Sequence, residues 1–222
     1  MNITETGDSF EEAVIVQDEP LAPSAAIAKL DNFANMPEMM AYASVLLASK
    51  LLPTSMKTPE AVVTVVLAGK ELGMPAIASI NNIVPIQGRP TLGIHAIGAL
   101  LRRAGGASQT LEDFVPVMGP DGTDTAGKVV DYRTTIRFYR PYRDKVLEED
   151  ASFTWKEATK MGLTDKDNWK RMPKVMLYSR CFALGARRCA PDAMLGMYET
   201  GEWADVTNQK YKVDSEGEVT IL

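Results

Sequence analysis

Residues 133–143 combine positive charge with aromatic rings, the two kinds of side chain that bind phosphates and stack on bases. This stretch holds four arginines and two tyrosines. The alternation of side chains over residues 129–140 predicts a strand. One face would carry Val130, Tyr132, Thr134, Ile136 and Phe138, and the other Asp131, Arg133, Thr135, Arg137 and Tyr139. Guanidinium groups beside aromatic rings suit single-stranded nucleic acid, although a sheet face that is merely polar and exposed would show the same pattern.

A second basic group is predicted on a helix over residues 171–189. On a helical projection, Arg180 and Arg187 share one azimuth at the border of an apolar arc. This arc is the expected core face and holds Met172, Val175, Met176, Ser179, Phe182, Ala183 and Ala186. Arginines at such a border either pair with buried acids, for which Asp192 is a nearby candidate, or bind an anion from outside. Three further cations form a separate and more exposed cluster, namely Lys170, Lys174 and Arg188.

Patterns for catalysis, metal binding and nucleotide binding are weak by comparison. Residues 122–129 approach a phosphate-binding loop, but Val129 stands where Ser or Thr would hold magnesium, and a strand is expected to follow instead of a helix. His95 is the only histidine, so a zinc site is not expected. We interpret the acidic run at 148–150 as a solvated turn. We therefore expect no catalytic residue, no metal and no cofactor.

The distribution of charge favours an anionic partner, although the net charge of the chain is −5. Residues 1–40 carry a charge of −7 and residues 192–222 a charge of −5, whereas residues 41–191 carry +7. A basic body between acidic ends is typical of proteins that bind a polyanion. A solvated charged face is the alternative explanation of the same numbers.

The elements that must position these residues are a mixture of helices and strands. Helices are expected over about 24–30, 35–52, 58–72, 94–103, 154–161 and 171–189. Residues 82–93 contain a β-hairpin signal, and residues 107–118 and 128–140 are expected to be extended. The expected fold is α+β, with a small antiparallel sheet and a β-hairpin backed by several helices.

Length and composition predict one globular domain between acidic ends. The chain has 222 residues, of which 45% are hydrophobic and 24% are charged, which are ordinary globular values. We expect a disordered acidic leader over 1–23, a single domain over 24–204 and an acidic, weakly structured tail over 205–222. No apolar run approaches the roughly 20 residues of a membrane-spanning helix, and the start is acidic where a secretory signal would be basic. A cytoplasmic protein without a membrane partner is therefore expected.

Three segments taken in order resemble the RecT family, the ATP-independent single-strand annealing proteins of phages and prophages. The resemblance covers roughly residues 58–204. It depends on TPEAVVTVVLAGKELGM around Pro59–Gly73, on the hairpin IVPIQGRP that begins at Ile83, and on the block from Trp169 to Gly196. In that block the residues that match the family pattern in order are Met176, Leu177, Arg180, Arg187, Pro191, Asp192 and Gly196.

The resemblance implies a mixed fold that assembles with copies of itself into rings or helical filaments in the cytoplasm of a bacterial host. Single-stranded DNA and the nascent duplex would lie in a basic groove along the assembly, and a phage exonuclease would supply the single strands. The chain departs from the family pattern in two ways. His95 lies where the family often has a lysine, and the chain after Trp203 is short for the module that recruits a host single-strand-binding protein, so that partner is not carried over.

Together, the basic residues and the resemblance predict a homo-oligomeric protein that binds and anneals single-stranded DNA and is not an enzyme. The residues expected to contact DNA are Arg89, His95, Arg133, Arg137, Tyr139, Arg140, Lys174, Arg180 and Arg187. The first alternative is a sequence-independent module that binds single-stranded nucleic acid without annealing it. The second is a small nuclease or phosphotransferase that uses the acids at 148–150 or the loop at 122–129.

Overall fold

The computed structural model describes residues 33–120, 123–206, 211–213 and 219–221. The predicted leader over 1–23 and the helix expected over 24–30 lie outside these residues. Within them, helices combine with small antiparallel sheets, which confirms the predicted α+β fold.

The described part of the chain begins with three helices, α2 (Met36–Ala48), α3 (Pro59–Glu71) and α4 (Ala76–Asn82). Asn35 and Thr58 cap the first two, because each side chain accepts a hydrogen bond from a backbone N–H in the first turn. The helix expected to reach residue 52 ends earlier, at Ala48. Helix α3 buries a cluster of valines, and the short α4 was not predicted.

A β-hairpin follows and agrees with the predicted one. Strand β1 (Ile83–Ile86) pairs antiparallel with β2 (Arg89–Leu92). The connecting residues Gln87 and Gly88 have φ values of 48° and 74°, the left-handed pair that a tight two-residue hairpin requires. Helix α5 (Ile94–Arg103) comes next, and its residue Arg103 donates a hydrogen bond to the Gly73 carbonyl after α3.

The main sheet has the strand order β3-β4-β5, formed by Ala107–Met118, Val129–Tyr142 and Lys145–Thr154. On β4 the predicted alternation is confirmed, since Thr134, Ile136 and Phe138 are fully buried whereas the intervening side chains reach the surface. Strand β5 corrects the interpretation of residues 148–150 as a turn. These acids pair directly with residues 137–139 of β4, because a third strand covers the edge of β4.

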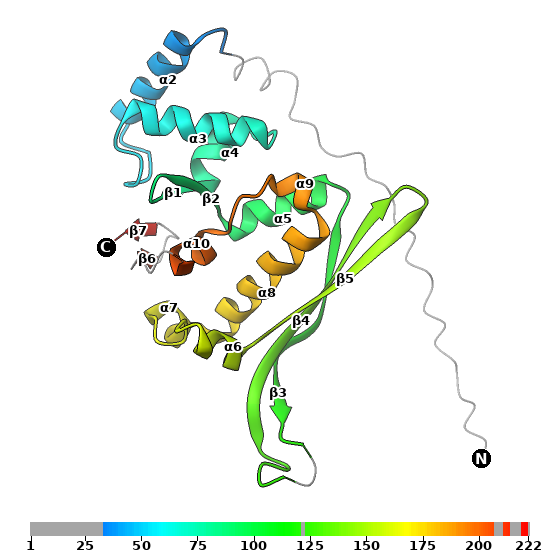
Figure 1. The fold of residues 1–222 in the computed structure, drawn as a ribbon. Helices are drawn as coiled ribbons and strands as arrows, with labels where there is room; N and C mark the ends of the chain where they lie inside the picture. The colour runs from blue at the N-terminus through cyan, green and yellow to red at the C-terminus, as the bar shows by residue number, and fades with distance from the viewer. Residues whose placement is uncertain (1–32, 121–122, 207–210, 214–218, 222) are drawn as a thin grey trace, which may run out of the picture.

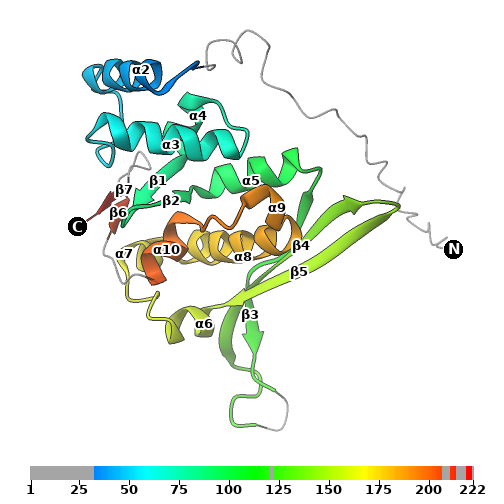
Figure 2. The same cartoon turned by 45° about the horizontal axis from the view of Figure 1, so that its top comes forward.

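The helices α6 (Trp155–Lys160), α7 (Asp167–Arg171), α8 (Pro173–Cys189) and α9 (Pro191–Met194) follow the sheet. Helix α8 packs across β4 and β5 on one side and against α5 on the other, so that the elements form stacked layers (Figures 1 and 2). The predicted core face of α8 was partly wrong. Met172 and Val175 are about half exposed, whereas Leu177 and Cys181 are fully buried, because the sheet covers a different arc from the one that apolar side chains alone indicated.

The chain then forms α10 (Thr200–Val206) and the strand pair β6 (Tyr211–Val213) and β7 (Val219–Ile221). The domain boundary predicted at residue 205 therefore falls inside a helix, and the weakly structured tail predicted after it contains a strand pair. Among the described residues no single helix is long and apolar enough to cross a membrane, and only α3 and α4, bent by 106°, meet the length and composition test as a pair.

Candidate nucleic-acid interface

The polar face of the main sheet holds Arg133 in a two-pronged ion pair. Its Nε and Nη2 donate to the two carboxylate oxygens of Glu112 on β3, at 2.7 and 2.6 Å. The hydroxyl of Thr135 donates to the same carboxylate at 2.6 Å. The hydrogen bond from Arg133 is the main reason why the pKa of Glu112 lies below its ordinary value. The guanidinium plane of Arg133 is thus held in one orientation.

Arg137 follows Thr135 on the same face of β4. It is held in the same way as Arg133, but from the other neighbouring strand. It donates to both carboxylate oxygens of Asp150 on β5, at 2.7 and 2.9 Å, and Glu148 lies 3.9 Å away. The hydrogen bond from Arg137 lowers the pKa of Asp150. The phenol of Tyr139 donates to Gln109 on β3 at 2.9 Å. Arg133, Arg137 and Tyr139 therefore each have a cross-strand partner.

Three further cations pair between α8 or α9 and the sheet. Arg140 donates to both oxygens of Asp192 on α9, one of them at 2.6 Å. Asp192, which the sequence offered as a candidate partner for Arg180 or Arg187, pairs with Arg140 at the end of β4. Lys174 lies 2.9 Å from Asp113 on β3, and Arg188 lies 3.3 Å from Glu149 on β5.

These contacts change the electrostatic character of the predicted site. Arg133, Arg137, Arg140 and Lys174 each face a carboxylate, so the sheet presents ordered pairs of opposite charge and not a uniformly positive surface. A two-pronged pair at the surface still leaves guanidinium N–H groups for another acceptor. A phosphate could therefore bind beside a carboxylate or displace it, with a guanidinium already oriented.

A second group of predicted residues surrounds the segment between α9 and α10. Arg187 donates to Glu202 at 2.9 Å, and only 8% of the Glu202 side chain is exposed. The guanidinium of Arg187 also lies 5.1 Å from the centre of the Tyr198 ring. Arg187 therefore has the structural role that the sequence left as an alternative, with Glu202 as its partner in place of Asp192.

Glu199 lies in the same segment and is an unusual acid. Burial raises its pKa to about 7, the nearby charge of Glu202 acts in the same direction, and the charge of Arg180 opposes it. Its carboxylate accepts a hydrogen bond from the backbone N–H of Glu202 at 2.9 Å. The segment is joined to the hairpin, since the Leu92 N–H donates to the Tyr198 carbonyl at 2.9 Å.

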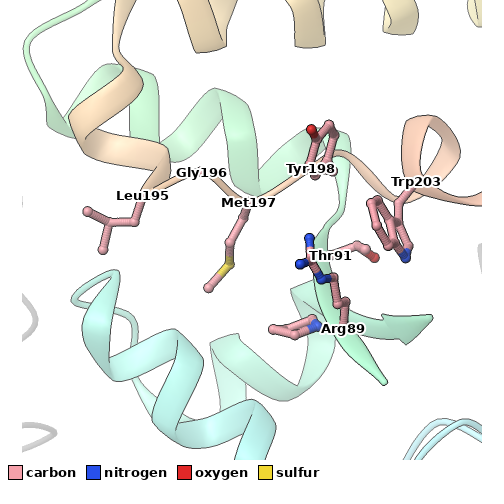
Figure 3. Close-up of a pocket in the computed structure, with 8 residues that line it drawn as sticks. Arg89, Thr91, Leu195, Gly196, Met197, Tyr198 and Trp203 are labelled. Carbon is pink, nitrogen blue, oxygen red and sulfur yellow. The ribbon is translucent and has the colours of Figure 1, made fainter. Parts of the chain in front are cut away.

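A small pocket opens where this segment meets the hairpin (Figure 3). It has a volume of about 180 Å³ and is lined by Arg89, Pro90, Thr91, Leu195, Gly196, Met197, Tyr198 and Trp203. The guanidinium of Arg89 lies 4.9 Å from the centre of the Trp203 ring, and the rings of Tyr198 and Trp203 are 5.3 Å apart. The Trp203 indole N–H donates to the Ile86 carbonyl at 3.2 Å, which ties the ring to the hairpin.

The structure thus divides eight of the nine predicted residues into two groups. Four of them, Arg133, Arg137, Tyr139 and Arg140, lie on β4, and Lys174 on α8 pairs with the sheet. Arg89, Arg180 and Arg187 surround residues 198–203. His95 is exposed in the first turn of α5. Four residues at this site were not predicted, namely Tyr198, Glu199, Glu202 and Trp203. Their signal in the sequence is two aromatic residues interleaved with acids after the basic helix.

The loop that approached a phosphate-binding motif runs into a strand. Val129 is the first residue of β4, and the Lys128 ammonium donates to the Asp124 carbonyl at 3.1 Å. In the described part of the chain, no group of three or more His, Cys, Asp or Glu side chains is placed to hold a metal ion.

Comparisons with protein-family models, curated proteins and solved structures find no match to this chain.

Proposed function

We propose that this protein binds single-stranded DNA without sequence preference and anneals complementary strands without ATP, as an assembly of identical subunits. The observation that carries the proposal is the row formed by Arg133, Arg137 and Tyr139 on one face of β4, in which cross-strand partners orient both guanidinium groups. Arg133 and Arg137 lie on the same face of β4 with Thr135 between them, so two cations and the Tyr139 ring follow one line along the strand, which suits contact with an extended backbone.

Annealing in this proposal needs no catalytic residue. Two DNA strands repel each other through their phosphates, and arginines that neutralise both backbones lower this barrier. Base pairing then supplies the free energy. The carboxylates beside the arginines weaken the hold on each strand, because they compete with phosphate for the same N–H groups. A protein that must release its duplex product gains from such competition.

The proposal includes partners and a location that follow from the resemblance. The protein would act in the cytoplasm of a bacterial host, in phage-type recombination and repair, on single strands produced by a phage exonuclease. It would bind both single strands and the nascent duplex. A host single-strand-binding protein is not part of the proposal.

The decisive experiment mixes two complementary oligonucleotides, each labelled with one dye of an energy-transfer pair, with and without the full chain and in the absence of ATP. We expect the protein to accelerate duplex formation many-fold. The double variant Arg133→Gln/Arg137→Gln should lose most of this acceleration, whereas Arg102→Gln, which changes an exposed arginine on α5, should retain it. Retention of full activity in the double variant would contradict the proposal.

The same experiment decides between the proposal and its main alternative. A protein that only protects single strands would bind each oligonucleotide, as measured by fluorescence anisotropy, and yet would leave the rate of duplex formation unchanged or lower it. Release of shortened DNA or of phosphate would instead favour the enzyme alternative.

A further inference from the structure

The pocket between β2 and the segment before α10 lies apart from the row of ion pairs on the sheet and has a different chemistry. We propose that it holds a single unstacked nucleobase, with the phosphate next to that base on Arg89. This inference rests on the proposed function, because it assigns to the same DNA strand a second contact that recognises bases and not the backbone.

The walls of the pocket match a flat, uncharged ring. Tyr198 and Trp203 contribute two aromatic rings to the lining of the pocket, and Met197 adds a polarisable sulfur to it (Figure 3). A volume of about 180 Å³ is small, which favours a single ring system over a folded peptide or a lipid chain. Aromatic rings bind any base through its face, so such a pocket needs no particular sequence.

Charge at the pocket favours one anion at its edge. Among the described residues that line the pocket, Arg89 alone carries a charge, and it is exposed. Arg187 contacts the Tyr198 ring but is not among the lining residues, and its charge is matched by Glu202. One cation beside a neutral aromatic surface is complementary to one nucleotide, whose base is neutral and whose phosphate carries the charge.

The pocket is also built before any ligand arrives. The Trp203 indole is tied to Ile86, and Arg187, held by Glu202, packs on the Tyr198 ring. Rings that are already positioned lose little conformational freedom on binding.

The rim of the pocket has a left-handed backbone turn and an exposed apolar side chain. Leu195 and Gly196 have consecutive left-handed φ values of 46° and 76°, and the Leu195 side chain is 56% exposed. Leu195 is the left-handed C-cap of the short helix α9, so this helix end places its exposed side chain at the rim of the pocket.

The test compares binding of the full chain to oligothymidylate and to an abasic strand of the same length by fluorescence anisotropy. Tyr198→Leu and Tyr198→Phe form a matched pair, because both lose the hydroxyl and only the first loses the ring. We expect Tyr198→Leu to weaken binding to oligothymidylate about fivefold or more and to leave binding to the abasic strand unchanged. Tyr198→Phe should bind both strands like the parent chain.

Arg89→Ala and Arg102→Ala provide the charge control, since both change an exposed arginine in the same half of the molecule. The first should weaken binding to both strands, and the second neither. As a direct readout, an oligonucleotide that contains 5-iodouracil is irradiated with the protein, and the cross-linked peptide is identified by mass spectrometry. We expect the peptide that contains Tyr198 and Trp203.

The outcomes separate the inference from the proposed function. If the parent chain anneals DNA but Tyr198→Leu affects both strands equally, or if the cross-link falls only on the sheet, the pocket does not hold a base and the proposed function stands. If the parent chain binds no oligonucleotide, the proposed function and the inference both fail. A cross-link at Tyr198 or Trp203 in a chain that binds but does not anneal supports the pocket and overturns annealing.

Discussion

At the scale of single residues, Arg187 shows how a cation at the border of a core becomes part of the fold. It pairs with Glu202, whose side chain is almost fully buried, and it packs on Tyr198. Its neighbour Arg188 pairs with Glu149 across a surface where both side chains are more than 40% exposed. The two arginines are adjacent in sequence, but removal of Arg187 would leave a buried carboxylate without its cation, whereas removal of Arg188 would leave an exposed one.

We predict that Arg187→Ala lowers the free energy of unfolding by about 3 kcal/mol, because it leaves the buried Glu202 carboxylate without its cation. Arg188→Ala should cost less than about 1 kcal/mol, as is usual for exposed pairs. Urea unfolding followed by circular dichroism measures both values. If both variants lost the same free energy of unfolding, the pairing of Glu202 with Arg187 would not contribute to stability.

Glu199 leads to a prediction about pH. Its ordinary pKa of 4.5 rises to about 7 in the folded protein, mainly through burial. Since the folded state holds this proton more tightly than the unfolded state, the stability contributed by Glu199 falls as pH rises from about 4.5 to about 7 and stays low above that. The penalty is at most about 3 kcal/mol.

Glu199→Gln should remove this penalty while it keeps an oxygen that accepts the Glu202 N–H. We expect the variant to be more stable than the parent chain at about pH 8 and equally stable at about pH 4, as measured by thermal unfolding across the pH range. A variant that is less stable than the parent at both pH values would mean that the ionised carboxylate is the favoured form.

At the scale of elements, helix α8 carries Lys174, Arg180 and Arg187 and packs against the strands β4 and β5. Gly185 lies where α8 crosses β4 and β5, and a Cβ at this position would come within 2.0 Å of the Phe138 ring and 2.7 Å of the Ala151 Cβ. Glycine is therefore needed here for close approach, although glycine is a poor helix former.

We predict that Gly185→Ala destabilises the protein by about 1–3 kcal/mol through overpacking and weakens DNA binding by displacing α8 from the sheet. The matched control is Gly98→Ala in α5, where the new Cβ would meet Phe182 at an ordinary 3.7 Å. That variant should be neutral or more stable by up to about 1 kcal/mol, because alanine favours the helix. Comparison of the two melting temperatures tests the packing.

At the scale of the whole molecule, the basic body of the chain is not a uniformly positive surface. Acidic side chains lie next to basic ones in the fold, although the sequence showed acidic ends on either side of a basic middle. The basic body of the sequence contains Glu112, Asp113, Glu148, Glu149 and Asp150, each of which faces a predicted or neighbouring cation. Such a surface balances attraction of phosphate against competition from carboxylates.

We predict that DNA binding weakens steeply with salt, with a slope of about −0.7 per phosphate neutralised on a single strand. Glu112→Gln, which frees the guanidinium of Arg133 from a charged competitor, should tighten binding several-fold at low salt. Glu71→Gln, an exposed acid at the end of α3, should change it little. Anisotropy titrations at several salt concentrations provide the slopes, and weaker binding by Glu112→Gln would contradict competition between this carboxylate and phosphate.

Much of the local structure could be read from the sequence. Caps and prolines marked the starts of α2 and α3, the residues around Gly88 marked the hairpin, and alternation over residues 129–140 assigned the buried and exposed faces of β4. These signals are local, because a cap, a tight turn and a strand face each depend on residues within a few positions of one another.

Only the tertiary structure decided which charges meet. Arg140 reaches Asp192 across 52 residues, Arg187 takes Glu202 in place of Asp192, and the acids of β5 face Arg137 and Arg188 because a third strand pairs there. Trp203 and Arg89 line one pocket although more than a hundred residues separate them. A sequence states the sign of each charge, but the partner of that charge depends on how strands and helices pack, and packing is set by the whole core at once.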